Sequence, residues 1–169
     1  PRIGSIDDAL RCAEIVNNWV ESTKWMPKLY SKQELLEMIE EAIPLREIWV
    51  VGNPVSSYIS FNKELSQVVA LYSDKPGKGY VKVLLDKVKK GRKYIQLWSH
   101  SANEAAHRFY YREGFKAEDY KEKGDDGISE IKFECTILLF FSCIFKPDTP
   151  LKHDKTRFDS KTSALKLRF

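Results

Sequence analysis

The most informative segment of this chain is SHSANEAAHRFYYREGF, residues 99–115. It follows the apolar run Tyr94 to Trp98, which predicts a strand buried on both faces. Residues 103–113 then carry apolar side chains at helical spacing, and Gly114 is typical of the residue that ends a helix. The segment therefore predicts a strand, a turn and a helix in succession.

A similar unit precedes this segment along the chain. Gln67 to Tyr72 is almost entirely apolar, which predicts a second strand buried on both faces. The turn Pro76-Gly-Lys-Gly79 follows it. Residues 81–90 then place apolar side chains on one helical face and mostly lysines on the other, and Gly91 is suited to end that helix. Two strand, turn and helix units thus lie next to each other in the sequence.

The remaining segments predict further helices and strands. Two helices are expected over residues 5–21 and 31–43, because each segment opens with a serine followed three residues later by an acidic residue. Strands are expected at residues 1–3, 47–51, 57–61, 115–120 and 128–133. The strands at 47–51 and 57–61 form a hairpin around Gly52-Asn-Pro54.

Composition and charge exclude several classes of protein. The 169 residues, 43% of them hydrophobic, suit about one domain with a buried core. No apolar run reaches the roughly 18 residues of a membrane span, and the N-terminus lacks a signal sequence, so we expect a cytoplasmic protein without a membrane partner. The three cysteines are too scattered for a disulfide framework or a zinc site, and no metal is expected.

The end of the chain differs from the domain expected over residues 1–134. Residues 135–145 are an apolar run that either extends the last strand or is foreign to the domain, and it can equally form an interface. Residues 146–169 hold seven basic and three acidic side chains, which account for the whole net charge of +4. A solvated, poorly ordered tail is the simplest explanation, so no nucleic-acid partner is expected. The alternative is a domain that binds DNA through this tail.

The glycine turn at Pro76 to Gly79 has the design of an anion site. The first N–H groups of a helix have no acceptor within the helix, and glycine lets a phosphate approach them closely. Pro-Gly is also an ordinary turn, so this pattern alone leaves both explanations open. It is neither a Walker loop nor a GxGxxG fingerprint.

The helix after the second strand carries a more specific pattern. Its residues Asn103, Ala106, Tyr110, Gly114 and Phe115 have a spacing that resembles the last sequence motif of the GNAT superfamily of acyl-CoA-dependent N-acetyltransferases. The run Leu71-Tyr72, Gly77-Lys-Gly79 and Leu84-Leu85-Asp86 is similar to the CoA-binding motif of that family. Arg2, Asp8-Ala9, and the segment from Asn17-Asn-Trp19 through Trp25-Met-Pro27 also resemble its opening segment. The resemblance covers roughly residues 2–133.

The resemblance implies an α/β (α+β) fold with a mixed, mostly antiparallel central sheet flanked by helices. A V-shaped splay is expected between the two central strands. The implied activity is the transfer of an acetyl group from acetyl-CoA, as co-substrate, to a primary amine of a small molecule. The amine attacks the thioester directly, without a covalent enzyme intermediate.

The same resemblance implies where acetyl-CoA binds. Its pantetheine arm pairs with the backbone of residues 71–73 like an added strand, and its pyrophosphate lies on the N–H groups of residues 77–82. The cofactor-binding residues expected in this way are Leu71, Tyr72, Ser73, Gly77, Lys78, Gly79, Tyr80, Val81, Lys82, Asn103, Ala106, Phe109 and Tyr110.

Two residues are expected to carry the proton transfers. Tyr110 matches the family tyrosine that protonates the departing CoA thiolate. The alternative is that Tyr110 is an ordinary aromatic residue of the core. The attacking ammonium must first lose a proton, and His100 is the candidate base because an ordinary imidazole has a pKa of about 6.5. The alternative for His100 is a polar loop residue. Trp25 and Met26 either line the acceptor pocket or join the first two helices.

Two positions depart from the family pattern. Pro76 stands where Gln or Arg is usual, and Val81 stands where Gly or Ala is usual. Val81 adds bulk where the backbone is expected to approach a phosphate. The alternative function is therefore a catalytically degenerate GNAT-like module that binds a ligand or partner without acetyl transfer. The sequence does not fix the acceptor, and a homodimer is one of the open arrangements.

Overall fold

The computed structural model describes residues 1–137, so the predicted tail and most of the apolar segment before it lie outside the described residues. In chain order the elements are β1 (Arg2–Ile3), η1 (Ile6–Asp8), α1 (Ala9–Ser22), α2 (Lys32–Ala42), β2 (Glu47–Gly52), β3 (Val55–Asn62), β4 (Gln67–Ser73), α3 (Tyr80–Lys89), β5 (Tyr94–His100), α4 (Glu104–Arg112), β6 (Lys116–Lys121) and β7 (Glu130–Thr136).

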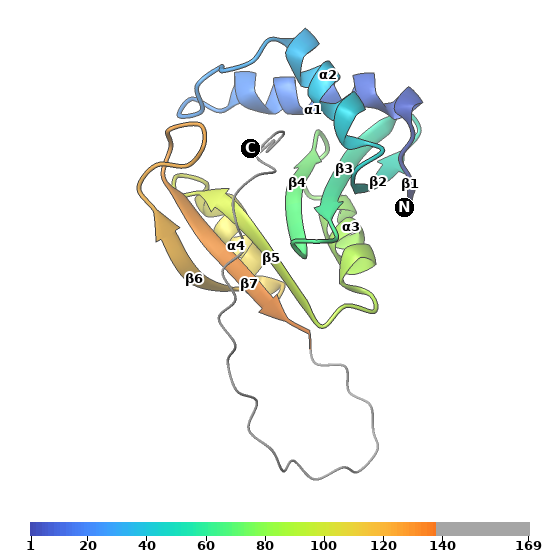
Figure 1. The fold of residues 1–169 in the computed structure, drawn as a ribbon. Coiled ribbons are helices and arrows are strands. Elements are labelled where there is room, and N and C mark those ends of the chain that lie inside the picture. The colour runs from blue at the N-terminus through green and yellow to red at the C-terminus, as the bar shows by residue number, and fades with distance from the viewer. Residues whose placement is uncertain (138–169) are drawn as a thin grey trace, which may run out of the picture.

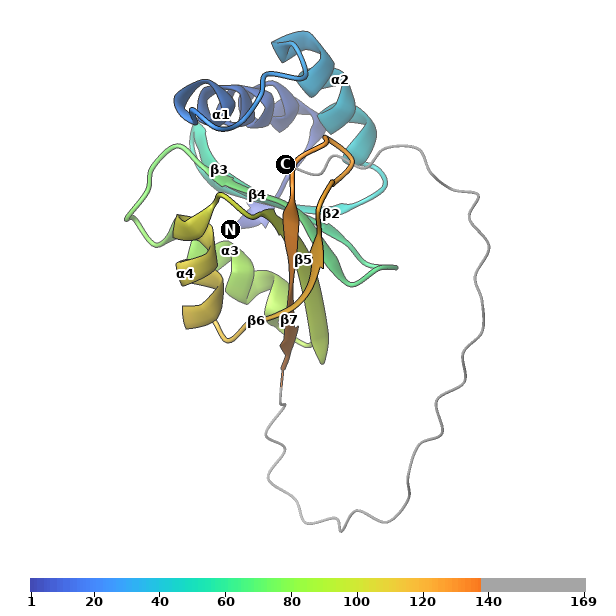
Figure 2. The same ribbon diagram turned by 90° about the vertical axis from the view of Figure 1, so that its left-hand side faces the viewer.

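The strands form one seven-stranded sheet in the order β1-β2-β3-β4-β5-β7-β6. All neighbouring strands pair antiparallel except β4 and β5, which are parallel. Helices α1 and α2 lie on one side of the sheet, and α3 and α4 lie on the other (Figures 1 and 2). This mixed, mostly antiparallel sheet flanked by helices confirms the predicted fold class.

The second helix begins as its capping pattern predicts. At α2 the Ser31 hydroxyl accepts a hydrogen bond from the Glu34 N–H at 3.2 Å, and the Glu34 carboxylate accepts one from the Ser31 N–H at 2.7 Å. The first predicted helix is divided, because the short 3-10 turn η1 precedes α1. Asp8 ends that turn and accepts two hydrogen bonds from the Arg2 guanidinium, both 2.7 Å long.

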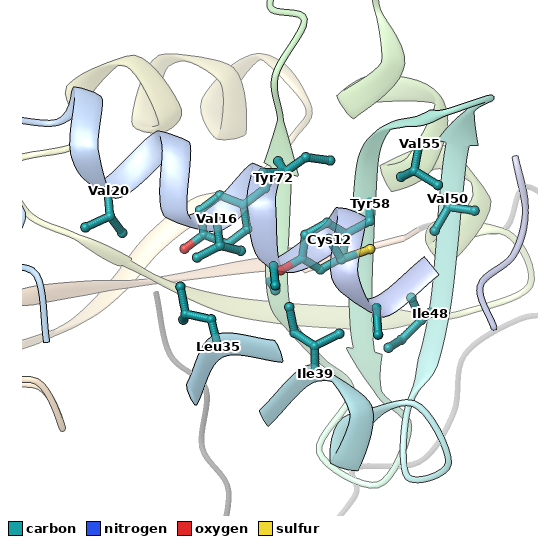
Figure 3. Packing of buried hydrophobic residues seen from close by; sticks show 14 of the residues in the cluster. Cys12, Val16, Val20, Leu35, Ile39, Ile48, Val50, Val55, Tyr58 and Tyr72 are labelled. Carbon is teal, nitrogen blue, oxygen red and sulfur yellow. The ribbon is translucent and has the colours of Figure 1, made fainter. Parts of the chain in front are cut away.

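Alternate residues of the central strands build two separate cores. Tyr58 of β3 and Tyr72 of β4 point to the α1 and α2 side, where Val16 and Ile39 cover them (Figure 3). The next residue along β3, Ile59, belongs to the second core, which α3 and α4 cover. Burial of apolar surface in each core stabilises the folded chain by roughly 25 cal/mol for each Å² that is removed from water. Because successive side chains of a strand point to opposite faces of the sheet, the same strands contribute to both cores, and each core holds one pair of helices on the sheet.

The two central strands pair over only a short distance. Within the described residues, the β4 and β5 ladder consists of Gln67 with Gln96 and Val68 with Leu97. After these pairs the two ribbons diverge (Figure 1). The prediction that both strands are buried on both faces is wrong for alternate residues, since Leu71 and Trp98 are only half-buried. The physical reason is the cleft beside these strands, which leaves part of their surface uncovered.

The last strand is longer than the sequence pattern indicated. β7 continues to Thr136, which pairs with Tyr94, and Cys135 pairs with Ile95. The first two residues of the apolar segment 135–145 thus belong to the strand, because β5 provides partners up to its first residue. In residues 1–137 the longest helix, α1, has 14 residues, and no helix there combines the length and apolarity of a bilayer span.

Candidate active site

A cleft of about 1050 Å³ opens where β4 and β5 stop pairing. Its wall is built from α1, β4, the loop before α3, the first turn of α3, the end of β5, and α4. Most of the residues predicted for the site meet in this wall. They are Leu71, Tyr72, Ser73, Gly77, Gly79, Tyr80, Val81, Lys82, His100, Asn103, Ala106, Phe109 and Tyr110.

The first part of the wall is an open strand edge. β4 pairs with β3 as far as Ser73, which lies opposite Ser57 and accepts a 2.7 Å hydrogen bond from the Ser57 hydroxyl. On its other edge β4 has no strand partner after Val68 within residues 1–137. Backbone groups on this edge can therefore pair with an extended ligand in the way that an added strand pairs.

The second part of the wall is the start of α3. Gly77 and Gly79 have φ angles of +78° and +75°, and a Cβ added to either residue would meet no atom within 4 Å. These glycines are thus required by the backbone conformation, and the space beside them is open. The first backbone hydrogen bond of α3 runs from the Val83 N–H to the Gly79 carbonyl. The N–H groups of residues 80–82 therefore have no acceptor within the helix. The arrangement suits an anion.

Lysines near this turn are held in different ways. Lys78 is exposed and is not part of the cleft wall, so the structure does not bring this predicted residue into the site. Lys82 lies in the wall and forms ion pairs with Asp86 at 2.8 Å and with Glu113 at 3.2 Å. The hydrogen bond to Asp86 is the main cause that raises the pKa of Lys82. One cation is therefore fixed beside the start of α3.

The third part of the wall is α4, whose first turn is capped by Asn103. The Asn103 Oδ1 accepts a hydrogen bond from the Ala106 N–H at 3.3 Å. The helix then directs Tyr110 into the cleft wall and against the core, where its ring lies 5.4 Å from the Phe133 ring. Burial raises the pKa of Tyr110 to about 12. The phenol is thus protonated at neutral pH and can donate a proton. Tyr110 lines the cleft, where a proton donor is expected, and it also packs against Phe133 as an ordinary core aromatic would.

His100 is the last residue of β5 and is 2% exposed, so the alternative of a polar loop residue is wrong. Its Nε2 lies 2.6 Å from Oδ2 of Asp126, a residue of the turn between β6 and β7. The ring also meets the edge of Trp25 at a centroid distance of 5.6 Å. A buried imidazole beside a carboxylate thus stands in the cleft wall.

The two residues proposed for the acceptor pocket have different positions. Met26 is 6% exposed and packs in the core with α1 and α2. This position fits the alternative prediction, in which Met26 joins the first two helices and does not line the acceptor pocket. Trp25 is 37% exposed and is not in the cleft wall, although it contacts His100. Trp19 of α1 lies in the wall instead, with its ring 5.4 Å from the Tyr72 ring.

Sequence reasoning did not select Trp19 or Asp126 as site residues. Trp19 lies beside the apolar stripe of α1, and an aromatic residue there is also explained by ordinary packing. Asp126 belongs to a polar turn with the sequence Gly-Asp-Asp-Gly, and nothing in that sequence connects it with β5. Only the antiparallel pairing of β5 with β7 brings the turn to His100.

Comparisons with known proteins agree on one architecture. No protein-family sequence model and no curated sequence matches the chain. Solved structures do match it at low sequence identity. The acetyltransferase of the GNAT family from Bacillus cereus has a TM-score of 0.65 and 18% identity, and the match covers 81% of this chain and 96% of that one.

Two further structures show the same similarity. Apo-form YjaB from Escherichia coli has a TM-score of 0.65 and 19% identity, with 79% of this chain and 94% of that one covered. The putative acetyltransferase yncA from Salmonella typhimurium, solved with its cofactor acetyl-CoA, has a TM-score of 0.60 and 19% identity. That match covers 83% of this chain and 95% of that one. At these identities the comparisons establish the fold.

Proposed function

Because the chain has the GNAT fold, we propose that it is an acetyl-CoA-dependent N-acetyltransferase that acts on a primary amine of a small molecule. The observation that carries the proposal is the composition of the cleft wall. It combines an open strand edge, free helix N–H groups and a protonated tyrosine. The presence of acetyl-CoA in the similar Salmonella protein supports the choice of co-substrate.

Different parts of the wall have different proposed roles. The backbone edge of β4 at residues 71–73 holds the pantetheine arm, and the N–H groups of residues 77–82 hold the pyrophosphate. Lys82 lies beside them, with its charge balanced by Asp86 and Glu113. Asn103 and the cleft-facing residues of α4, Ala106 and Phe109, line the remaining contact surface.

Acetyl-CoA supplies the activated acetyl group, and the chain supplies the proton transfers. His100 takes a proton from the attacking ammonium, directly or through water, which frees the nitrogen lone pair. The new C–N bond forms as the C–S bond breaks, and the nitrogen then loses its second proton to water. Tyr110 then donates its phenolic proton to the sulfur that leaves. General acid and base groups of this kind contribute about 10²- to 10⁴-fold each.

Calorimetric titration of the full chain with acetyl-CoA and with CoA tests this function. We expect saturable heat for both ligands, together with a rise in the melting temperature as ligand exceeds its Kd. Absence of heat at millimolar ligand would contradict the proposal. A CoA-free amine titration is the control for nonspecific effects.

A catalytically degenerate module is the second candidate, and Pro76 and Val81 favour it. Both residues line the cleft, and the Val81 side chain is half-buried at the first turn of α3, where the pyrophosphate is proposed to bind. This candidate predicts a folded protein that acetylates no amine. Release of CoA thiol in the presence of primary amines, measured against acetyl-CoA alone, separates it from the enzyme.

A further inference from the structure

We propose that Asp126 is a positioning residue for His100. Its carboxylate fixes the proton on one ring nitrogen and leaves the other nitrogen, Nδ1, free to accept a proton. The catalytic meaning of this pairing rests on the proposed acetyl transfer. The pairing itself is a property of the folded chain, and it can be measured without any substrate.

The distance and burial of the two groups support a defined pairing. Oδ2 of Asp126 is 2.6 Å from Nε2 of His100, and the side chains are 8% and 2% exposed. An ionised carboxylate has only acceptor sites, so the ring must donate through Nε2–H. A neutral imidazole has one N–H and one lone pair, and the lone pair is then on Nδ1.

The turn between β6 and β7 holds the carboxylate in place. Its other oxygen, Oδ1, accepts a hydrogen bond from the Ile128 N–H at 2.9 Å. The turn is closed by a bond from the Gly124 N–H to the Ile128 carbonyl at 2.6 Å, and by one from the Gly127 N–H to the Gly124 carbonyl at 3.1 Å. Oδ1 is thus bonded to the backbone while Oδ2 lies beside the imidazole.

The imidazole is held as firmly from its own side. His100 is paired with Glu130 in the ladder of β5 and β7, and the next residue, Ser101, donates its N–H to the Ser129 carbonyl at 2.8 Å. The edge contact with Trp25 covers the ring. His107 donates to the backbone carbonyl of His100 rather than to the ring. Among the described residues 1–137, Asp126 is therefore the hydrogen-bond partner of this ring.

The geometry defines a conservative test of this role. In Asp126→Asn, the amide oxygen is expected to keep the hydrogen bond from the Ile128 N–H, because this oxygen is the only acceptor of the amide group. The amide NH₂ then faces Nε2 and donates to it. Nε2 must accept, so the neutral ring carries its proton on Nδ1. The variant keeps the shape of the pair and removes the lone pair that the reaction needs.

Nitrogen-15 NMR of the histidine rings measures the tautomer in the full-length protein without ligand. His100→Gln identifies the His100 signals, and Asp125→Asn, a change at the neighbouring exposed carboxylate, is the matched control. We expect Nε2–H in the wild type and in Asp125→Asn, and Nδ1–H in Asp126→Asn. An Nδ1–H ring in the wild type, or an unchanged tautomer in Asp126→Asn, would overturn the inference. The wild-type reading stands even if the variant does not fold.

Kinetics separate positioning from a structural role. The assay follows CoA thiol released from acetyl-CoA with tyramine, spermidine or a short peptide as the amine. We expect Asp126→Asn to lower kcat by about 10²- to 10⁴-fold, with the Kd for acetyl-CoA within twofold of the wild type. Wild-type turnover in Asp126→Asn would overturn the role. If the proposed function itself is wrong, the wild type will not bind acetyl-CoA or will release no CoA thiol with any amine, whereas the tautomer measurement gives the same result.

Discussion

Tyr110 allows the proposed chemistry to be tested at a single oxygen atom. Its phenol is buried and protonated at neutral pH, and its ring packs against aromatic neighbours that a phenylalanine would keep. We expect Tyr110→Phe to lower kcat by about 10²-fold and to change the Kd for acetyl-CoA by less than twofold. Steady-state kinetics and calorimetry measure the two quantities separately.

The matched control lies at the next position of the same helix. Tyr111 is 55% exposed, and its ring also contacts Phe133. Tyr111→Phe removes the same atom from the same helix outside the cleft wall, so we expect wild-type turnover. Equal turnover in both variants would return Tyr110 to a purely structural role.

Gly79 and Gly91 form a second matched pair, one at each end of α3. Their φ angles are +75° and +77°, and a Cβ at either position would meet no atom within 4 Å. Alanine therefore costs a similar backbone strain at both, about 1–2 kcal/mol. Only Gly79 lies in the cleft wall. We expect Gly79→Ala to weaken acetyl-CoA binding at least tenfold and Gly91→Ala to leave it unchanged, by calorimetry; equal affinities would place the pyrophosphate elsewhere.

Asp8 gives a prediction for pH dependence. The hydrogen bonds from Arg2 lower its pKa below the ordinary value of 3.8. Because the folded pKa is lowered, the stabilisation is present above about pH 4 and is lost as the pH falls through the folded pKa. We expect Asp8→Asn to lower the unfolding free energy by about 1 kcal/mol at pH 7, with a smaller difference at pH 3.

Urea unfolding at the two pH values measures this effect. The control is Glu21→Gln, which breaks the exposed ion pair with Lys28 and should not change the unfolding free energy measurably. An Asp8→Asn difference that does not depend on pH would show that the carboxylate charge is not the cause.

At the scale of elements, α3 joins the two halves of the sheet. Its residues Leu84, Leu85 and Val88 are fully buried in the core that contains Ile59 of β3 and Ile95 of β5. We expect Leu84→Ala to lower the unfolding free energy by about 2–5 kcal/mol, since it leaves a cavity in a close-packed core. Val83, the preceding residue, is 45% exposed, and Val83→Ala is expected to cost less than about 1 kcal/mol in the same denaturant titration.

Local signals were sufficient to predict most of the elements. Serine caps, periodic apolar residues and glycine at helix ends place α1 to α4 close to their observed bounds, because all of these effects operate within a few residues. The division of the first helix by η1 was not predicted, and the extension of the last strand into residues 135–136 was only one of the alternatives given for the apolar segment. Both involve partners distant in the sequence. The end of β7 pairs with the β5 backbone, and Asp8 of η1 is bound by Arg2, whose strand pairs with β2.

At the scale of the molecule, part of the site follows from the sequence and part does not. The motif residues of α4 and the glycine turn meet in one cleft, because each directly follows a strand of the same sheet. Trp19 joins them, and Asp126 reaches His100, only through tertiary packing. Met26 lies in the core and Lys78 is exposed, so neither lines the cleft. Sequence spacing determines which residues share an element, whereas side-chain neighbours across elements depend on the whole fold.

The two-pair ladder between β4 and β5 has a consequence for cooperativity. The halves of the sheet share few backbone bonds, so we expect the amides at the cleft edge of β4 to open at a free energy below that of global unfolding. A ligand paired along residues 71–73 would add bonds beyond the point where the ladder ends. We expect hydrogen exchange at cleft-edge amides of these residues to slow markedly with acetyl-CoA, while amides bonded to β3 change little. Uniform protection across β4 would indicate one cooperative unit; selective protection would mean that the co-substrate completes the sheet.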